Sequence, residues 1–324
     1  MKKGIFHYLL ILLACCLLQS ARAQCILGAL SKELLDPNTS QEFKNFIKNN
    51  PEGMNAYGKY LVNPEIRKDV DVLTSTANFL TRRSDYLTAY PGQFEEILDN
   101  LKKAGARCKL CTSGKQNKGI PMLNVIIDDM DWALETFHGG NVDIQKLFTE
   151  MAANSPKADG GSFALNVLRA NARSDASYIG SIQKFEWKYL EDGKFEADIW
   201  RQVGDEHYLT EFKSFAESSW QGFSNNADYV KQFMAYFRSE KNFEYLANVA
   251  KLSTVENPAR FVKTQFMKIF EANAAKLMET RPELFNGVKF GTETINIETV
   301  EELKNLCQNA DFAESSLFNF VKVK

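Results

Sequence analysis

The strongest constraint on the fold is a run of three segments in which apolar and polar residues alternate. The alternation has a period of two over 181–191, 194–203 and 207–215, which is the pattern of half-buried strands. Asp192-Gly193 and Gly204-Asp205 separate these segments, and both pairs are typical of tight hairpin turns. The sequence therefore predicts a meander of three antiparallel strands.

Helical spacing precedes and follows this meander. Apolar residues recur every three or four positions in the segments 122–136, 143–153, 228–237 and 260–279. Asp159-Gly160-Gly161 predicts a turn, and Ser162 is expected to cap the helix that leads into the meander. A fourth strand is expected around 243–250. The order helix, three-strand meander, helix, strand, helix predicts an α+β fold.

Length and composition fit a folded chain of about two domains. The 324 residues are 44% hydrophobic and 25% charged, which excludes a disordered or collagen-like protein. We expect a signal peptide over 1–23, a helical amino-terminal region over 24–155 and an α+β core with carboxy-terminal helices over 156–324. The formal charge of −2 excludes a uniformly basic surface, so any contact with nucleic acid has to be local.

The amino terminus predicts export. Lys2 and Lys3 precede an uncharged run from Tyr8 to Leu18, and Ala21-Arg22-Ala23 is a signal-peptidase pattern with cleavage after Ala23. The run is shorter than the roughly 18 apolar residues that a membrane span needs, and a lipoprotein signal at Cys16 fits less well. Cleavage removes three basic residues and no acid, which leaves a charge of about −5. We expect a periplasmic or secreted protein without a membrane anchor.

Export makes disulfides the favoured state of the remaining cysteines, Cys25, Cys108, Cys111 and Cys307. Cys108 and Cys111 have zinc-knuckle spacing, but no second pair of ligands lies near them in the sequence. A local disulfide, or pairs that include Cys25 and Cys307, is the preferred interpretation.

Acids and one lysine gather on the predicted meander. Glu196 and Asp198 share one face of the second strand, and Glu211 and Lys213 share one face of the third. Carboxylates are the ligands that Mg²⁺ or Mn²⁺ prefers, so Asp198, Glu211 and Glu196 are the candidate metal ligands. Lys213 would orient the attacking water or neutralise charge on a phosphate.

The helix after the meander adds Gln232 and Tyr236, which lie four residues apart and therefore on one face. Together with Asp198 and the Glu211-Phe212-Lys213 triplet, they resemble the active site of the PD-(D/E)xK nuclease superfamily, in its Gln-x-x-x-Tyr variant. The resemblance spans about 161–236 and implies a restriction-endonuclease-like core. Many members place a further acid on the first core helix, where this chain has Asn166, so Glu196 would supply it.

The segments 56–61 and 130–134 are also similar to the helical lead-in of nuclease modules of bacterial polymorphic toxins. The resemblance implies a Mg²⁺-dependent nuclease that acts on DNA rather than RNA, with an immunity protein as a candidate partner. Trp200 and Trp220 flank the predicted site and could stack on a base. The alternative is an exported binding or structural protein that keeps this fold without catalysis.

Overall fold

The computed structural model describes residues 69–110, 116–138, 142–188, 196–239 and 241–324, with a few isolated positions before them. The predicted signal peptide, Cys25, Cys111 and segment 56–61 lie outside the described residues. Within the described residues, no helix is both long and apolar enough to cross a membrane.

The amino-terminal helices are α6 (Val70–Arg82), α7 (Ser84–Ala89), α8 (Gln93–Ala104), α9 (Leu123–Thr136), α10 (Gln145–Ala153), α11 (Ser155–Ser174) and α12 (Ser177–Ser181). The meander follows as β1 (Ile182–Lys188), β2 (Glu196–Val203) and β3 (Glu206–Lys213). The remaining elements are α13 (Glu217–Gln221), α14 (Ala227–Arg238), β4 (Asn242–Ala247), α15 (Pro258–Ala272), α16 (Ala274–Thr280), β5 (Val288–Phe290), β6 (Glu293–Ile295), α17 (Val300–Gln308) and β7 (Val321–Val323), with short 3-10 turns between them. The predicted α+β class is confirmed.

The sheet has the strand order β1-β2-β3-β4-β7. The strands β1, β2 and β3 pair antiparallel, whereas β4 pairs parallel to β3 and β7 parallel to β4. Helix α14 connects β3 to β4, because a parallel neighbour needs a crossover. Gly204 takes a φ of 61° at the turn between β2 and β3, which glycine adopts without strain.

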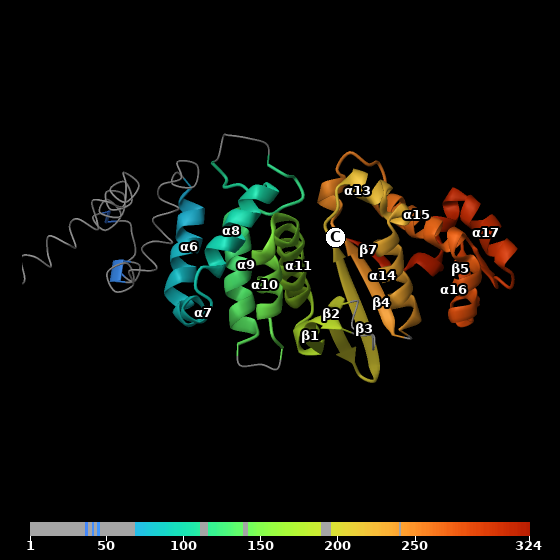
Figure 1. The fold of residues 1–324 in the computed structure, drawn as a ribbon, viewed down its shortest axis with the longest axis horizontal. Coiled ribbons are helices and arrows are strands. Elements are labelled where there is room, and N and C mark those ends of the chain that lie inside the picture. The colour runs from blue at the N-terminus through green and yellow to red at the C-terminus, as the bar shows by residue number, and fades with distance from the viewer. Residues whose placement is uncertain are drawn as a thin grey trace, which may run out of the picture.

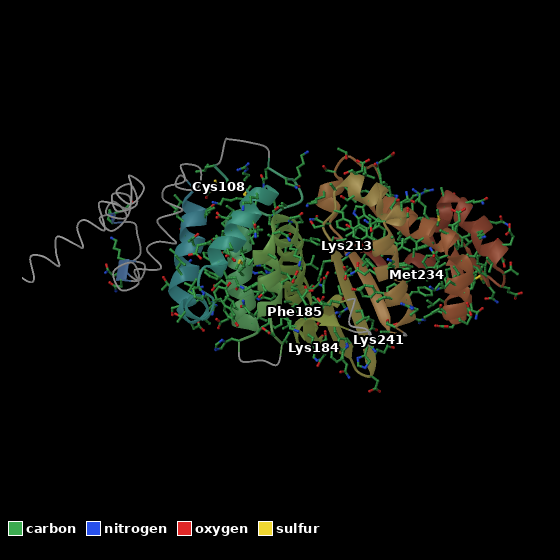
Figure 2. The ribbon with its side chains drawn as sticks, in the orientation of Figure 1. Cys108, Lys184, Phe185, Lys213, Met234 and Lys241 are labelled. Atoms are coloured by element: carbon green, nitrogen blue, oxygen red, sulfur yellow. The ribbon has the colours of Figure 1, made fainter. Side chains whose placement is uncertain are left out.

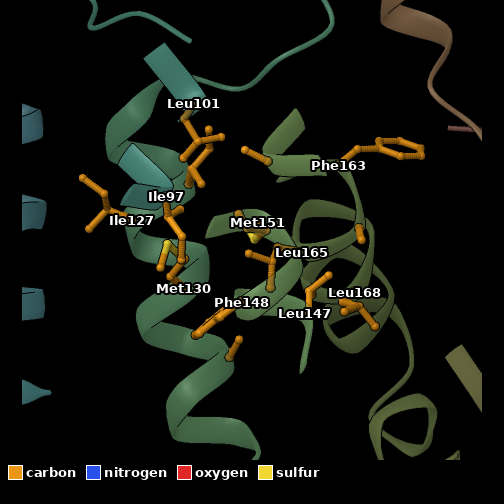
Figure 3. Close-up of a cluster of buried hydrophobic side chains, with 14 of the residues drawn as sticks. Ile97, Leu101, Ile127, Met130, Leu147, Phe148, Met151, Phe163, Leu165 and Leu168 are labelled. Carbon is orange, nitrogen blue, oxygen red and sulfur yellow. The ribbon is translucent and has the colours of Figure 1, made fainter. Parts of the chain in front are cut away.

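Two hydrophobic clusters cover the two faces of this sheet (Figure 1). On one face, Phe185, Ile199 and Phe212 belong to a cluster formed with the helices α6 to α11. The helical part of this cluster includes Ile97, Met130, Phe148 and Leu165 (Figure 3). On the other face, the cluster includes residues of α14, α15, α17 and the carboxy-terminal turns. Hydrophobic clusters therefore pack against both faces of the sheet.

The turn predicted at Asp159-Gly160-Gly161 is wrong, because α11 runs through it without a break. Its cap is Asn154, whose side chain accepts a hydrogen bond from Lys157 N at 3.0 Å. A Cβ at Gly161 would lie 2.2 Å from Met151, so this glycine allows α10 and α11 to pack closely. Gly161 therefore serves helix packing and not a turn.

The cysteines are only partly as predicted. Cys108 is disulfide-bonded, and its partner lies outside the described residues. Cys307 is a free thiol on α17 that is buried, so the predicted pairing that included Cys307 is wrong.

Burial makes the Cys307 thiol unreactive, which gives a simple test of the carboxy-terminal packing. Desolvation raises the pKa of Cys307 to about 12, and a protonated thiol is a poor nucleophile. We expect iodoacetamide at pH 8 to leave Cys307 unmodified in the native protein and to modify it once the chain is unfolded in guanidinium. Mass spectrometry of the Cys307 peptide measures this, and rapid labelling of the native protein would contradict the packing.

Candidate active site

The site begins where β2 and β3 separate. The last backbone pair between these strands joins Ile199 to Thr210, and beyond it the ladder ends. Phe212 N instead donates a hydrogen bond to Asp198 Oδ2 at 2.6 Å. A carboxylate thus replaces a backbone carbonyl in the ladder, which fixes Asp198 in the gap between the two strands.

Four of the predicted residues meet in one hydrogen-bonded network on the α14 face of β3. Lys213 Nζ donates to Glu211 Oε1 and, at 3.2 Å, to Gln232 Oε1. Gln232 Nε2 donates to Glu211 Oε1 at 3.0 Å, and the Tyr236 hydroxyl donates to Glu211 Oε2. Glu211 and Lys213 are only 3% and 8% exposed, so this is a buried ion pair whose charges are both hydrogen-bonded.

Helix α14 is held so that its polar residues reach this pair. Asn226 caps the helix by accepting hydrogen bonds from Asp228 N and Tyr229 N. Phe233 and Phe237 are buried in the cluster beneath the helix. The four-residue spacing then turns Gln232 and Tyr236 toward the end of β3.

The carboxy-terminal end of β3 is fixed by a second set of hydrogen bonds. Asn248 N donates to Lys213 O at 2.9 Å, and Asn248 Nδ2 donates to Ser214 Oγ at 3.0 Å. Ser214 Oγ donates to Asp159 Oδ1 on α11 at 3.1 Å, and Lys251 Nζ forms an ion pair with the same Asp159. Figure 2 shows Lys213 near this end of the sheet, while Lys184 and Lys241 lie toward the opposite end. The backbone under Lys213 is therefore rigidly placed.

The electrostatics keep Lys213 charged. Burial alone would lower the pKa of Lys213, but the charges of Glu211 and Asp198 outweigh this effect and raise it. Lys213 therefore remains an ammonium group that can stabilise negative charge. It is not placed to remove a proton from water.

Glu186 on β1 is a site residue that the sequence analysis missed. Its backbone has a φ of 46°, and it lines a cavity together with Asp198. Burial and the charges of Glu211, Glu150 and Glu196 raise the pKa of Glu186 to about 8. Burial and the charges of Glu211 and Glu186 also raise the pKa of Asp198 well above its ordinary value. The nearby cations therefore do not balance the negative charge of Glu186, Asp198 and Glu211.

Glu196 and Asn166 lie outside the side-chain network around Glu211 that the hydrogen bonds define. The backbone carbonyl of Glu196 accepts a hydrogen bond from the Tyr236 hydroxyl at 3.3 Å, and the Glu196 charge acts on Glu186. The Asn166 amide donates a hydrogen bond to Asp129 Oδ2 on α9 at 3.4 Å. A further acid whose charge acts on Asp198 is Glu186 on β1.

The aromatic residues beside Lys213 are also not those predicted. Trp220 is fully buried and cannot stack on a base. Trp200 donates through its indole N–H to His207 Nδ1 at 3.1 Å and stacks on that imidazole. The ring centroids of Phe215 and Tyr229 instead lie 5.6 Å and 5.7 Å from Lys213 Nζ. These two half-buried rings cover the ammonium group.

No protein-family model, curated protein or solved structure matches this chain. The chemistry of the site therefore has to be argued from its own residues. They offer a carboxylate in the gap between two strands, a buried carboxylate–ammonium pair, and an amide and a phenol that hold this pair in place.

Proposed function

We propose that this protein is a metal-dependent nuclease that hydrolyses phosphodiester bonds at the gap between β2 and β3. The observation that carries the proposal is the convergence of Glu211, Lys213, Gln232 and Tyr236 in one network, beside Asp198. Residues from two strands and one helix meet there, although they are separated by up to 38 positions of the chain. A solvated strand face would not need to bury and pair these charges.

A divalent cation fits the donor set. Asp198 and Glu211 are hard oxygen ligands, and the charges of both act on Lys213. Among the described residues, no group of three or more His, Cys, Asp or Glu side chains is arranged to hold a metal by itself. Mg²⁺ needs no such group, because it commonly takes one or two carboxylates and completes its shell with water and substrate phosphate. Asp198 and Glu211 would bind the cation, and Glu196, the first residue of β2, would be a further ligand.

The chain's own residues would have distinct roles in hydrolysis. Bound Mg²⁺ or Mn²⁺ would supply a polarised phosphate oxygen and a water of lowered pKa. Lys213 would donate a hydrogen bond to the phosphate oxygen on which charge develops, and Gln232 and Tyr236 would hold the Glu211–Lys213 pair in position. The water oxygen forms a bond to phosphorus and gives a proton to solvent, the bond from phosphorus to one sugar oxygen breaks, and that oxygen takes a proton from solvent.

DNA, an exported location and an immunity partner belong to the same proposal. They are supported by the signal pattern that ends at Ala23 and by the resemblance to toxin nuclease modules. The acidic charge of the chain favours local contact with the polymer rather than binding along an extended basic surface.

Cleavage of simple polymers tests the proposal. The purified chain from Gln24 is incubated with plasmid DNA, single-stranded DNA and RNA, in Mg²⁺ or Mn²⁺ and in EDTA. We expect at least one polymer to be cut with the metal present and none in EDTA, with gel electrophoresis as the readout. A folded protein that cuts none of them would contradict the proposal and favour the non-catalytic binding protein.

A further inference from the structure

Helix α14 carries a third polar side chain on the side that meets β3. Tyr229 lies three residues before Gln232 and seven before Tyr236, so the three side chains follow one side of the helix. Gln232 and Tyr236 both donate hydrogen bonds to Glu211. The Tyr229 hydroxyl makes no hydrogen bond to any of the described residues, and it is not enclosed by the protein. Tyr229 therefore has a free O–H donor that reaches solvent.

Lys213 also has a donor without an acceptor. An ammonium group carries three N–H donors. Lys213 Nζ donates to Glu211 Oε1 and Gln232 Oε1, and no further acceptor contacts it in the part of the chain that the structure describes. The ring centroids of Phe215 and Tyr229 lie 5.6 Å and 5.7 Å from Nζ. Aromatic rings attract the charge, but they do not replace an oxygen acceptor.

The two free donors belong to one place in the molecule. Besides burial and the acids described above, the Tyr229 phenol acts on the pKa of Lys213 and raises it. The hydroxyl and the ammonium group are therefore within electrostatic range of each other. Both residues lie on the α14 side of β3, where Gln232 and Tyr236 hold the Glu211–Lys213 pair. The free donors thus face the same opening of the proposed active site.

Neighbouring aromatic residues hold the Tyr229 ring in position. Phe223 is fully buried and stacks on this ring, with the centroids 5.3 Å apart and the planes at 22°. The half-buried ring of Phe215 lies 5.2 Å from it. The backbone is fixed as well, because Tyr229 N donates to Asn226 Oδ1 at 3.2 Å. The ring is therefore packed against other rings, and its hydroxyl is preorganised for a ligand outside the protein.

Two free donors on one side of a site suit an anion with more than one oxygen atom. A metal cation would find no ligand here, because an ammonium group has no lone pair to offer. A phosphodiester has two non-bridging oxygens, and hydrogen bonds from an ammonium or a hydroxyl group to a charged oxygen are the strong ones. The phosphate of the substrate is therefore the group that this opening fits.

We propose that Tyr229 is a second phosphate-binding residue of this site, and that its hydroxyl and the free N–H of Lys213 bind the non-bridging oxygens of the phosphate that is cleaved. The inference rests on the proposed nuclease function and goes beyond it by naming the part of the substrate that this opening binds. Contacts to phosphate carry no information on base identity. This part of the site therefore accepts a phosphodiester whatever the bases beside it.

Removal of the Tyr229 hydroxyl tests this proposal. Tyr229→Phe deletes one oxygen and keeps the ring that Phe215 and Phe223 contact. We expect Tyr229→Phe to keep the wild-type thermal midpoint and to lower kcat/KM by roughly 10- to 100-fold on the polymer that the wild type cuts, the scale of one hydrogen bond to a charged group. Tyr90→Phe is the matched control, because Tyr90 is 41% exposed at the end of α7. It should keep wild-type activity and thermal midpoint.

Sulfur substitution shows whether the contact is direct. Each non-bridging oxygen of the linkage that is cut fastest is replaced in turn by sulfur, a weak hydrogen-bond acceptor, which gives two diastereomers. We expect the wild type to cut the diastereomer with sulfur at the Tyr229 position more slowly than the oxygen substrate. Tyr229→Phe should lose less on that diastereomer, because its hydrogen bond is already absent. Any effect of sulfur on the bound metal is common to both proteins and cancels in this comparison.

The outcomes separate this inference from the proposed function. A wild type that cuts, beside an equally active Tyr229→Phe, would overturn the role of Tyr229 and leave the nuclease proposal intact. Identical sulfur effects in the two proteins would do the same, and so would a fall in thermal midpoint that accompanies the loss of activity. A wild type that cuts no polymer would overturn both proposals.

Discussion

Lys213→Met is expected to lower the free energy of unfolding by about 3–5 kcal/mol, the usual cost of removing one partner from a buried ion pair. Glu211 would keep the hydrogen bonds from Gln232 and Tyr236 but lose the only cation that contacts it in the described structure. At 3% exposure, the Glu211 carboxylate has almost no access to water as a substitute. Chemical denaturation in EDTA measures the change.

The double variant Lys213→Met, Glu211→Gln separates the charge from the contacts. It removes both charges and keeps an amide that can still hydrogen-bond to Gln232 and Tyr236. We expect this variant to regain most of the lost stability, because a matched apolar or neutral replacement of a buried pair is often close to neutral. If Lys213→Met alone is as stable as the wild type, the pair is solvated in the native protein and the account of the site is wrong.

Glu186→Gln is expected to stabilise the metal-free protein, and increasingly so as the pH rises from about 5 to about 8. The pKa of Glu186 is raised from its ordinary 4.5 to about 8 by burial and by neighbouring acids. Between these values the folded protein binds more protons than the unfolded chain, so the stability of the wild type falls as the pH rises. The gain from Glu186→Gln should therefore vanish below about pH 4.5 and reach the order of 2 kcal/mol at pH 8.

Thermal midpoints in EDTA from pH 4.5 to 8.5 check this dependence. Glu293→Gln in the exposed β6 strand serves as the control, and its midpoints should follow those of the wild type at every pH. Mg²⁺ should stabilise the wild type at pH 8 more than it stabilises Glu186→Gln, since it supplies the charge that the acids lack. A constant difference between Glu186→Gln and wild type across the pH range would show that Glu186 is solvated.

Local patterns in the sequence predict much of this fold. The period of two predicts β1, β2 and β3 to within a few residues, and the helical period predicts α9, α10 and α14. The side chains of Glu211, Lys213, Gln232 and Tyr236 were predicted to converge because two short-range spacings, two and four, set their directions. Such spacings need no knowledge of long-range contacts.

The missed features depend on register and packing. A two-residue turn at Asp192-Gly193 would place Trp187 opposite Asp198. In the structure Phe185 pairs with Ile199 and Trp187 pairs with Ala197. The register therefore differs by one residue from that of a two-residue turn, and Glu186 lies opposite Asp198. The local sequence Gly160-Gly161 predicts a turn, but both residues lie inside α11. Gly161 is needed there because α11 packs closely on Met151 of α10, a contact that the local sequence does not reveal. The burial of Trp220 also depends on partners far along the chain, such as Phe266.

The most direct measurement is cleavage by the wild type beside the double variant Lys213→Met, Glu211→Gln, with both proteins shown to be folded to the same extent. We expect Mg²⁺-dependent cleavage of at least one nucleic acid by the wild type and a loss of at least about a hundredfold in the variant, the scale of removing one charge-stabilising donor. Equal cleavage by both proteins, or no cleavage by either, would contradict the claim that this site is a nuclease active centre.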